Sequence, residues 1–328
     1  MIISKTPLRA SLFGGGSDFE AYFKNSTLGY GSVLSATLDM HVYITVNKKF
    51  DDKIRVVYNG NELVDSVDEI KHNIIREALK ITGIKKGIEV IYMADIPLST
   101  AGIGLASSSA LAVGVLNALH AYKGEFVSKE TLAKEACHIE IDLLGQRIGI
   151  QDQYAVANGG FKRYRFLSDG NVNIAPILIN EDSKKKLYNN LMLFFTGTTR
   201  DSRKILSEQS DNIESKMKML DELVLTVDKV YDEINNGNID IVGEELDKTW
   251  QIKKSLSSGI SNETIEKMYN LAKDAGASGG KILGAGGGGF MLFYVKDSDK
   301  QKVRLALKDY RELPFRVDSE GSRIIFVD

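Results

Sequence analysis

Clusters of glycine constrain this chain more than any other feature of its sequence. Its 328 residues include 30 glycines but only 4 prolines, and many of the glycines gather in three clusters, at 14–16, 102–104 and 279–289. Glycine in the interior of a helix or strand is destabilising, because it loses more conformational freedom on folding than any other residue. We therefore expect the backbone in these clusters to approach a ligand, or another part of the backbone, very closely.

The second cluster leads directly into residues 107–122, which are small and apolar nearly all round and so predict a buried helix. Small residues at a helix N-terminus leave backbone N–H groups and the positive end of the helix dipole facing outward, an arrangement that suits phosphate. An ordinary serine cap would explain one of Ser107, Ser108 and Ser109, but not all three together with two glycines. The pattern favours an anion site.

The third cluster matches two known motifs, and both matches are coincidental. Residues 284–289 satisfy GxGxxG, but a predicted strand follows where a dinucleotide fingerprint requires a helix. Residues 276–280 satisfy GxSxG, yet all four histidines precede them, which excludes the hydrolase order of nucleophile, acid and histidine. Ile282 stands where a Walker A loop needs Ser or Thr. A tight hairpin is the alternative to a ligand-binding loop.

Composition excludes several classes of protein. Lys and Arg number 42 and Asp and Glu number 44, a net charge of −2 with no sustained basic run, which argues against nucleic acid or a membrane as partner. The single cysteine, Cys137, cannot form an internal disulfide, and no zinc-type CxxC spacing occurs. The sequence lacks a signal-peptide layout and an apolar run of about 20 residues. We expect a cytoplasmic protein, either a monomer or a homodimer.

Strand and helix patterns alternate through the first part of the chain, which includes a helix predicted over 129–144. Residues 202–257 contain no proline and are rich in charge, which predicts helices, and a last strand is expected at 323–327. This order predicts an α+β protein of two lobes, 1–185 and 186–328.

Taken in this order, the three clusters resemble the three motifs of the GHMP small-molecule kinases, such as galactokinase, homoserine kinase and mevalonate kinase. The matching stretches are Pro7–Asp18, Gly104–Ala110 and Lys281–Phe290, so the resemblance covers essentially the whole chain. Within this superfamily the sequence is most similar to the D-glycero-D-manno-heptose 7-phosphate kinases. The strings that carry this similarity are 13–18, 35–39, 149–154, 195–200 and 276–293. Ala106 departs from the pattern, because glycine or serine usually fills that position.

The resemblance implies a ribosomal-protein-S5-like α/β lobe at the N-terminus and an α+β lobe at the C-terminus. It also implies transfer of phosphate from ATP, with Mg²⁺, to the anomeric hydroxyl of a heptose 7-phosphate. Three alternatives stay open: a kinase for an unphosphorylated sugar such as fucose or galactose, an isoprenoid-pathway kinase, and a nucleotide-binding module without turnover.

The resemblance assigns a catalytic role to Asp152, which would act on the acceptor hydroxyl. If Arg200 and its neighbours bind the phosphate of the acceptor, Arg9 is left near the transferring group, where its positive charge would stabilise the transition state. The local sequence alone would rather make Asp152 a helix N-cap. Glu140 resembles the Mg²⁺ ligand of the family, with Ser108 or Ser109 as a hydroxyl ligand, although a solvated acidic helix face explains Glu140 equally well.

Binding residues follow from the same motifs. We expect the nucleotide at Gly102, Gly104, Leu105, Ala106, Ser107, Ser108 and Ser109. We expect the acceptor at Gly15, Gly16, Ser17, Asp18, Asp39, Thr198, Arg200, Gly286 and Gly287. Arg200 suits a phosphorylated sugar, because the guanidinium fork matches a phosphate. For the neighbouring Arg203 and Lys204, a basic solvated turn is the better interpretation.

Overall fold

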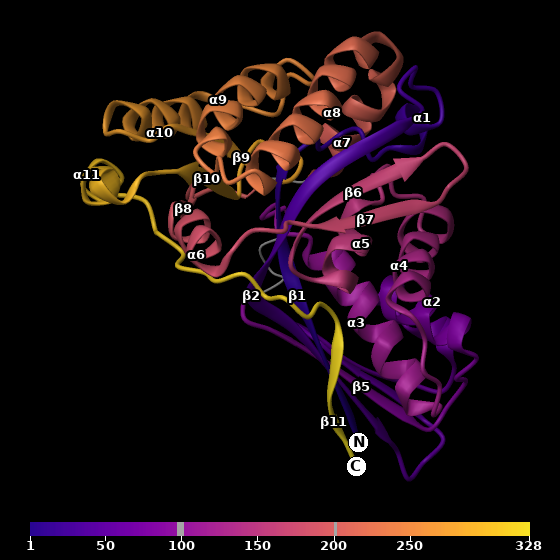
Figure 1. Ribbon diagram of the computed structural model, residues 1–328. Coiled ribbons are helices and arrows are strands. Elements are labelled where there is room, and N and C mark those ends of the chain that lie inside the picture. The colour runs from indigo at the N-terminus through magenta and orange to yellow at the C-terminus, as the bar shows by residue number, and fades with distance from the viewer. Residues whose placement is uncertain (97–101, 200–201) are drawn as a thin grey trace.

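Two β-sheets organise the part of the chain that the computed structural model describes, which comprises residues 1–96, 102–199 and 202–328 (Figure 1). The larger sheet consists of β1 (Ile2–Phe13), β2 (Tyr30–Lys48), β3 (Ile54–Val57), β4 (Asn61–Val64), β5 (Ile88–Ala94), β6 (Phe161–Leu167), β7 (Val172–Pro176) and β11 (Arg323–Val327). The smaller, antiparallel sheet consists of β8 (Leu191–Phe195), β9 (Gly279–Ile282) and β10 (Phe290–Tyr294). The predicted α+β class and two-lobed fold are confirmed.

The long strand β2 holds the larger sheet together. Its first half pairs with β6 and its second half pairs with β5, while β1 pairs with the part from Leu34 to Val46. The strand order is β11-β1-β2-β5-β3-β4, and β7 adds to β6. All pairs are antiparallel except β3 with β5.

Helices α2 (Asn73–Thr82), α3 (Ser107–Tyr122), α4 (Lys129–Cys137) and α5 (Gln151–Asn158) cover one face of this sheet (Figure 1). The predicted buried helix is α3, which packs against β1 and β2 with the other three helices around it. It approaches β1 closely at Gly114, whose carbonyl accepts a hydrogen bond of 2.8 Å from Ser4 Oγ. A Cβ at Gly114 would lie 3.0 Å from Thr6 Oγ1.

The helix predicted over 129–144 is interrupted. Its α-helical part ends at Cys137, and His138–Leu143 forms a π-helical turn, in which the Leu144 amide donates to the Ile139 carbonyl. This turn carries Glu140, whose side chain is completely buried. The expectation of a continuous helix was therefore wrong, and so was the alternative that places Glu140 on a solvated face. Such π-turns occur frequently at functional sites.

The helices in the second half of the chain are α6 (Glu181–Asn189), α7 (Ser202–Asp211), α8 (Ile213–Asn235), α9 (Ile241–Lys254), α10 (Glu263–Asp274) and α11 (Lys300–Ala306). The charged segment 202–257 predicted α7, α8 and α9. Helices α6, α9 and α10 pack on the smaller sheet, whereas α8 packs on α9 and against β1 and β2. Short turns complete the fold, at α1 (Glu20–Phe23) and at the 3₁₀ turns Val67–Glu69 and Asp297–Asp299. Helix α9 lies directly on β9, because neither Gly243 nor Gly279 carries a side chain at the contact.

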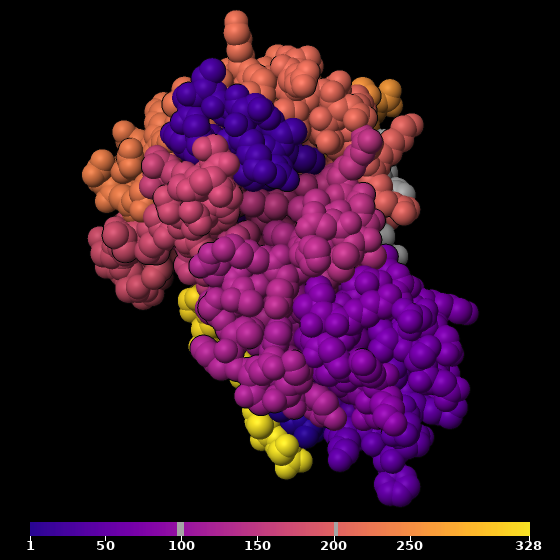
Figure 2. Space-filling view, turned by 90° about the vertical axis from the view of Figure 1, so that its right-hand side faces the viewer, coloured from indigo at the N-terminus to yellow at the C-terminus, as the bar shows by residue number. Residues whose placement is uncertain are grey.

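Two of the contacts between the lobes lie at α1 and at the end of the chain. The segment that contains α1, indigo in Figure 2, lies against the second lobe, where Tyr22 and Ser26 both donate to Asp221 on α8. At the other end of the chain, β11 pairs with β1 in the larger sheet, although it falls within the expected second lobe, 186–328. None of the helices in the described residues is long and apolar enough to cross a membrane.

Candidate active site

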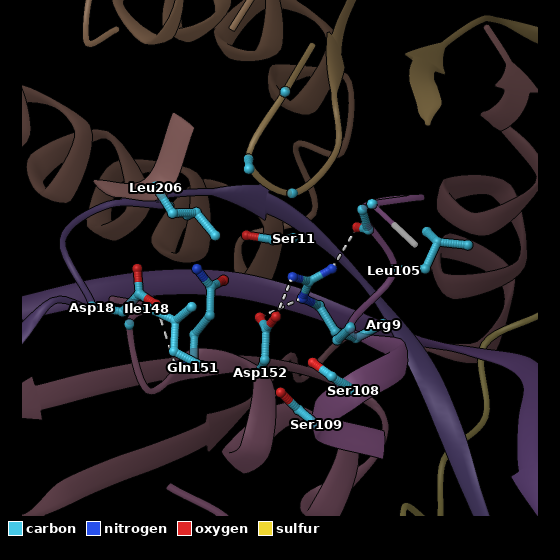
Figure 3. A pocket seen from close by; sticks show the side chains of 18 of the residues that line it. Arg9, Ser11, Asp18, Leu105, Ser108, Ser109, Ile148, Gln151, Asp152 and Leu206 are labelled. Atoms are coloured by element: carbon cyan, nitrogen blue, oxygen red, sulfur yellow. Dashed lines mark hydrogen bonds and ion pairs between the residues drawn. The ribbon is translucent and has the colours of Figure 1, made fainter. Parts of the chain in front are cut away.

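A cavity of about 590 Å³ lies between the lobes, and all three glycine clusters contribute to its wall. Its lining includes Gly15 and Gly16 of the first cluster, Gly102 and Gly104 of the second, and Gly284 and Gly286 of the third. The N-terminal end of α3, the start of α5 and the side chain of Leu206 on α7 complete the wall (Figure 3). The fold therefore brings the three sequence motifs to one place.

The second and third clusters touch each other backbone to backbone. Gly104 has φ +79°, and a Cβ there would lie 2.5 Å from the carbonyl oxygen of Leu283. A Cβ on Gly284 would lie 2.6 Å from the Cα of Gly104, and a Cβ on Gly289 would overlap the carbonyl of Ile103. At Gly104, Gly284 and Gly289, the absence of a side chain thus allows the second and third clusters to contact each other. The third cluster is also the turn of the β9–β10 hairpin, so its interpretation as a tight hairpin is confirmed, and its role as a ligand-binding loop stays a prediction.

The N-terminus of α3 faces the cavity, and its first amides have no partner within the helix. The first intrahelical bond of α3 runs from the Ala110 amide to the Ala106 carbonyl, so the amides of Ser107, Ser108 and Ser109 have no partner in the helix. The Ser107 hydroxyl is buried without a hydrogen-bond partner among the described residues. Ala106 has φ +60°, a left-handed conformation that costs a residue with a side chain roughly 1–2 kcal/mol. The anion site expected from the sequence has the required geometry.

Arg9 and Asp152 form a two-pronged ion pair inside the cavity (Figure 3). Arg9 Nε lies 2.7 Å from Asp152 Oδ1, and Arg9 Nη2 lies 2.6 Å from Oδ2. The remaining nitrogen, Nη1, donates to the carbonyl of Gly104 at 2.7 Å, which ties the second cluster to β1. Asp152 is the second residue of α5, whose N-cap is Ile150, so the N-cap interpretation of Asp152 was wrong.

Asp18 is buried beside this pair. Its carboxylate accepts hydrogen bonds from the amide of Gly16 at 2.9 Å and from the amide of Gln151 at 3.3 Å. Burial, followed by the negative charge of Asp152, raises the pKa of Asp18. A Cβ on Gly149 would overlap the Asp18 carboxylate, so this turn requires glycine. The turn before α5 therefore fixes Asp18 and Asp152 relative to each other.

Glu140 has the features of a cation ligand. Its Oε2 accepts hydrogen bonds from Ser109 Oγ at 2.8 Å and Gln153 Nε2 at 2.6 Å, while Oε1 has no partner among the described residues. Burial raises the pKa of this carboxyl, although the hydrogen bond from Ser109 acts in the opposite direction. A buried carboxylate with a free oxygen beside serine hydroxyls fits Mg²⁺, which prefers oxygen ligands.

The site offers Mg²⁺ few protein ligands. Across the described residues, no three His, Cys, Asp or Glu side chains gather closely enough to hold a metal ion. Substrate phosphates would have to complete the coordination, as is usual for Mg²⁺ in kinases. Ser108 is exposed in the cavity wall, whereas Ser109 is buried against Glu140, so the two serines have different positions with respect to a bound phosphate.

Several expected acceptor residues lie elsewhere. Ser17 is buried and bonds the carbonyls of Gly14 and Ser32, so it braces the turn instead of lining the cavity. Asp39 is exposed and accepts a hydrogen bond of 2.7 Å from the Arg316 amide. The register of β1 with β2 shifts at this point, between the pairs Pro7–His41 and Leu8–Leu38. Such a bulge redirects the side chains of a strand, and it leaves Asp39 away from the cavity.

Residues near the third cluster also differ from expectation. Thr198 and Gly287 do not line the cavity: the Thr198 carbonyl accepts from the Gly289 amide, and the Gly287 amide donates to the carbonyl of Ile260. Thr199 does line it. Arg200 lies outside the described residues, but Arg203 at the start of α7 belongs to the cavity wall.

One charged residue of the cavity escaped the sequence analysis. Lys253 lies near the C-terminal end of α9, buried in the wall beneath the third cluster. Its Nζ donates to the carbonyls of Ile282 at 3.0 Å and Gly284 at 2.7 Å. Burial above all, and then the charge of Arg9, lowers its pKa to about 7. In the sequence it is one of two adjacent lysines, and nothing in that pattern separates it from its neighbour.

Comparisons with known proteins agree with this arrangement. The family model described as the GHMP kinases N terminal domain matches residues 69–160, and that described as GHMP kinases C terminal matches residues 230–312. The chain is 31% identical over 321 residues to the D-glycero-alpha-D-manno-heptose 7-phosphate kinase of Campylobacter jejuni, covering 94% of this chain and 93% of that protein. The chain belongs to the GHMP kinases. It is therefore a phosphotransferase, and the predicted family is confirmed.

Solved structures share the fold of this GHMP kinase. The crystal structure of a D-glycero-D-manno-heptose 1-phosphate kinase from Bacteroides thetaiotaomicron superposes with a TM-score of 0.82, over 100% of both chains and at 23% identity. At that level of identity the likeness shows the fold alone. A putative sugar kinase from Campylobacter jejuni gives a TM-score of 0.72 at 28% identity, over 98% of this chain and 97% of the other.

Proposed function

We propose that this GHMP kinase transfers the terminal phosphoryl group of ATP to the anomeric hydroxyl of D-glycero-D-manno-heptose 7-phosphate and releases the 1,7-bisphosphate. The observation that supports the chemistry is the Arg9–Asp152 pair, which lies in one cavity with the N-terminus of α3. The choice of sugar and of hydroxyl rests on the similarity to the heptose 7-phosphate kinase of Campylobacter jejuni.

The nucleotide phosphates bind over the first turn of α3. Ser107, Ser108 and Ser109 line the cavity, their amides have no partner within the helix, and the positive end of the helix dipole attracts an anion there. The contact between Gly104 and Leu283 holds the third cluster beside this turn. The two loops together form a cradle that is made largely of backbone.

Asp152 accepts the proton of the acceptor hydroxyl. A carboxylate has about four lone-pair positions, and the guanidinium of Arg9 occupies two of them, which leaves others for the acceptor. Arg9 keeps Asp152 in place and brings positive charge to the transferring phosphoryl group. Mg²⁺, held by Glu140 and by Ser108 or Ser109, would neutralise phosphate charge when bound.

The acceptor binds on the side of the cavity formed by Gly15, Gly16 and Asp18. Asp18 and the backbone around it suit sugar hydroxyls, which both donate and accept hydrogen bonds. The 7-phosphate binds toward the start of α7, where Thr199 and Arg203 line the wall and Arg200 lies next in sequence. Arginine matches a phosphate dianion better than lysine because it donates from a planar fork.

A panel of acceptors tests this function. ADP release is measured with ATP, Mg²⁺ and, in separate reactions, heptose 7-phosphate, free heptose, fucose, galactose and mevalonate. We expect kcat/KM for the 7-phosphate to exceed that for free heptose at least tenfold, which corresponds to about 1.4 kcal/mol of phosphate recognition. Equal or better turnover of a free sugar would assign the enzyme to the unphosphorylated class. Absence of ADP release with every acceptor would favour a binding module.

A further inference from the structure

Lys253 lies buried under the third glycine cluster, and the chemistry described above does not use its amino group. Lys253 is 6% exposed, and its Nζ bridges two carbonyls of the loop, those of Ile282 and Gly284. An ammonium has three N–H donors, and these two carbonyls use two of them. Because Lys253 lines the cavity, the remaining donor is available to a bound ligand.

The groups around Lys253 leave its charge only partly balanced. Helix α9 packs against α8, β1, β9 and β10. Arg9 on β1 and Lys281 on β9 add positive charge, and the negative charge that acts on Lys253 is that of Asp18. The five residues of β10 include no charged side chain. Asp152 is already bound by Arg9. The pocket around Lys253 therefore favours an anion.

We propose that Lys253 contacts the terminal phosphate of the bound nucleotide, giving its third N–H to a phosphate oxygen while its other two hold the third glycine cluster in place. This inference rests on the proposed function, since it needs the nucleotide to bind between the second and third clusters. The geometry supports it in a specific way: Gly284, which Lys253 holds, is the residue that touches Gly104. Lys253 thus couples the position of the loop to the presence of an anion.

A protonation change follows from this contact. Burial lowers the pKa of Lys253 to about 7 in the free protein, so most of its side chains lack a proton at pH 8. A phosphate oxygen within hydrogen-bond distance raises this pKa, because an opposite charge favours the ammonium form. Binding of the nucleotide at pH 8 should therefore take up protons.

Isothermal titration calorimetry measures this uptake directly. AMPPNP, which is not hydrolysed, is titrated into the protein with Mg²⁺ at pH 8 in two buffers of different ionisation enthalpy. We expect a net uptake of protons in the wild type and none in Lys253→Met, and we expect this variant to bind AMPPNP at least tenfold more weakly. Lys254→Met is the matched control, because Lys254 pairs with Glu266 on α10 and should keep the wild-type uptake. Equal uptake in the wild type and Lys253→Met would overturn the proposal.

Titrations with other ligands identify the anion, and they distinguish failure of the Lys253 proposal from failure of the proposed function. ADP, which lacks the terminal phosphate, should cause much less uptake, and an equal uptake would overturn the assignment to that phosphate. Uptake on addition of the acceptor sugar phosphate alone would also overturn it. If Lys253→Met does not fold, Lys253→Arg takes its place. Because arginine is always charged, this variant should take up no proton when AMPPNP binds. Failure of AMPPNP to bind the wild type would contradict the proposed function, whereas binding without uptake contradicts only the role of Lys253.

Discussion

The contact between the second and third glycine clusters can be tested with a pair of glycine-to-alanine variants. Gly104 and Gly124 have nearly the same backbone conformation, with φ of +79° and +77°. A Cβ on Gly104 would lie 2.5 Å from the Leu283 carbonyl oxygen, whereas a Cβ on Gly124 would have nothing within 4 Å. Both substitutions therefore introduce the same backbone strain, and only Gly104→Ala also pushes the third cluster away.

The magnitudes follow from these two contributions. Left-handed backbone costs an alanine roughly 1–2 kcal/mol, so Gly124→Ala should lower the free energy of unfolding by about 1 kcal/mol. The steric conflict at Gly104 adds an overpacking cost of about 1–3 kcal/mol. We therefore expect a loss of about 2–4 kcal/mol in Gly104→Ala. Because the loop forms the phosphate cradle, the dissociation constant of AMPPNP should also rise at least tenfold in this variant.

Urea unfolding gives the two stability changes, and calorimetric titration with AMPPNP gives the affinities. Gly124→Ala should bind the nucleotide as the wild type does. The reasoning would be refuted if Gly104→Ala were no less stable than Gly124→Ala and bound AMPPNP with unchanged affinity, because the loop contact would then have no role in either property.

Three further substitutions address separate parts of the site and the fold. Asp152→Asn should lower kcat by a factor on the order of 10²–10⁴ with little change in the KM for ATP. Asp142→Asn, which changes an exposed carboxylate, is the control and should leave kcat unaltered. Steady-state kinetics measures both parameters in the two variants. Arg203→Ala should raise the KM of the sugar phosphate several-fold and leave that of ATP unchanged, in the same assay. Burial alone would raise the pKa of Asp318, but hydrogen bonds, led by the one from His41, hold this pKa well below its usual value. The stabilising effect of the carboxylate is therefore complete above about pH 5 and declines as the pH falls. Asp318→Asn should lower the free energy of unfolding by about 2 kcal/mol at pH 7, and thermal unfolding should show this difference from the wild type shrinking below pH 4.

The sequence predicted the local parts of the fold well, because short-range patterns determine them. Helix α3 begins and ends at the expected residues, since an apolar stretch behind a run of serines specifies a buried helix. The pairing of β11 with β1 joins residues at opposite ends of the chain, and no local pattern indicates such a partner. The π-turn at His138–Leu143 was missed for a related reason: it depends on the packing that draws Glu140 inward, which the spacing of acidic residues does not reveal.

The candidate site divides in the same way. Arg9, Asp18 and Asp152 belong to recognisable motifs, and the structure brings them into one cavity or to its edge. Asp39 also belongs to a matching string, but a register shift in the sheet turns it toward Arg316. Lys253 carries no motif, and its burial arises only because α9 lies on β9. Long-range packing thus determines the positions of Asp39 and Lys253, which sequence patterns did not predict.

The most direct test of the central claim is ³¹P nuclear magnetic resonance of the reaction mixture. Wild-type protein is incubated with ATP, Mg²⁺ and D-glycero-D-manno-heptose 7-phosphate, and the spectrum is compared with that of Asp152→Asn under the same conditions. Our account predicts that ADP and a second sugar phosphate resonance, coupled to the anomeric proton, appear together in the wild type and at least a hundredfold more slowly in the variant. A new phosphate on any other carbon, or ADP that forms without a new sugar phosphate, would contradict the proposed reaction, and equal rates in the two proteins would contradict the role of Asp152.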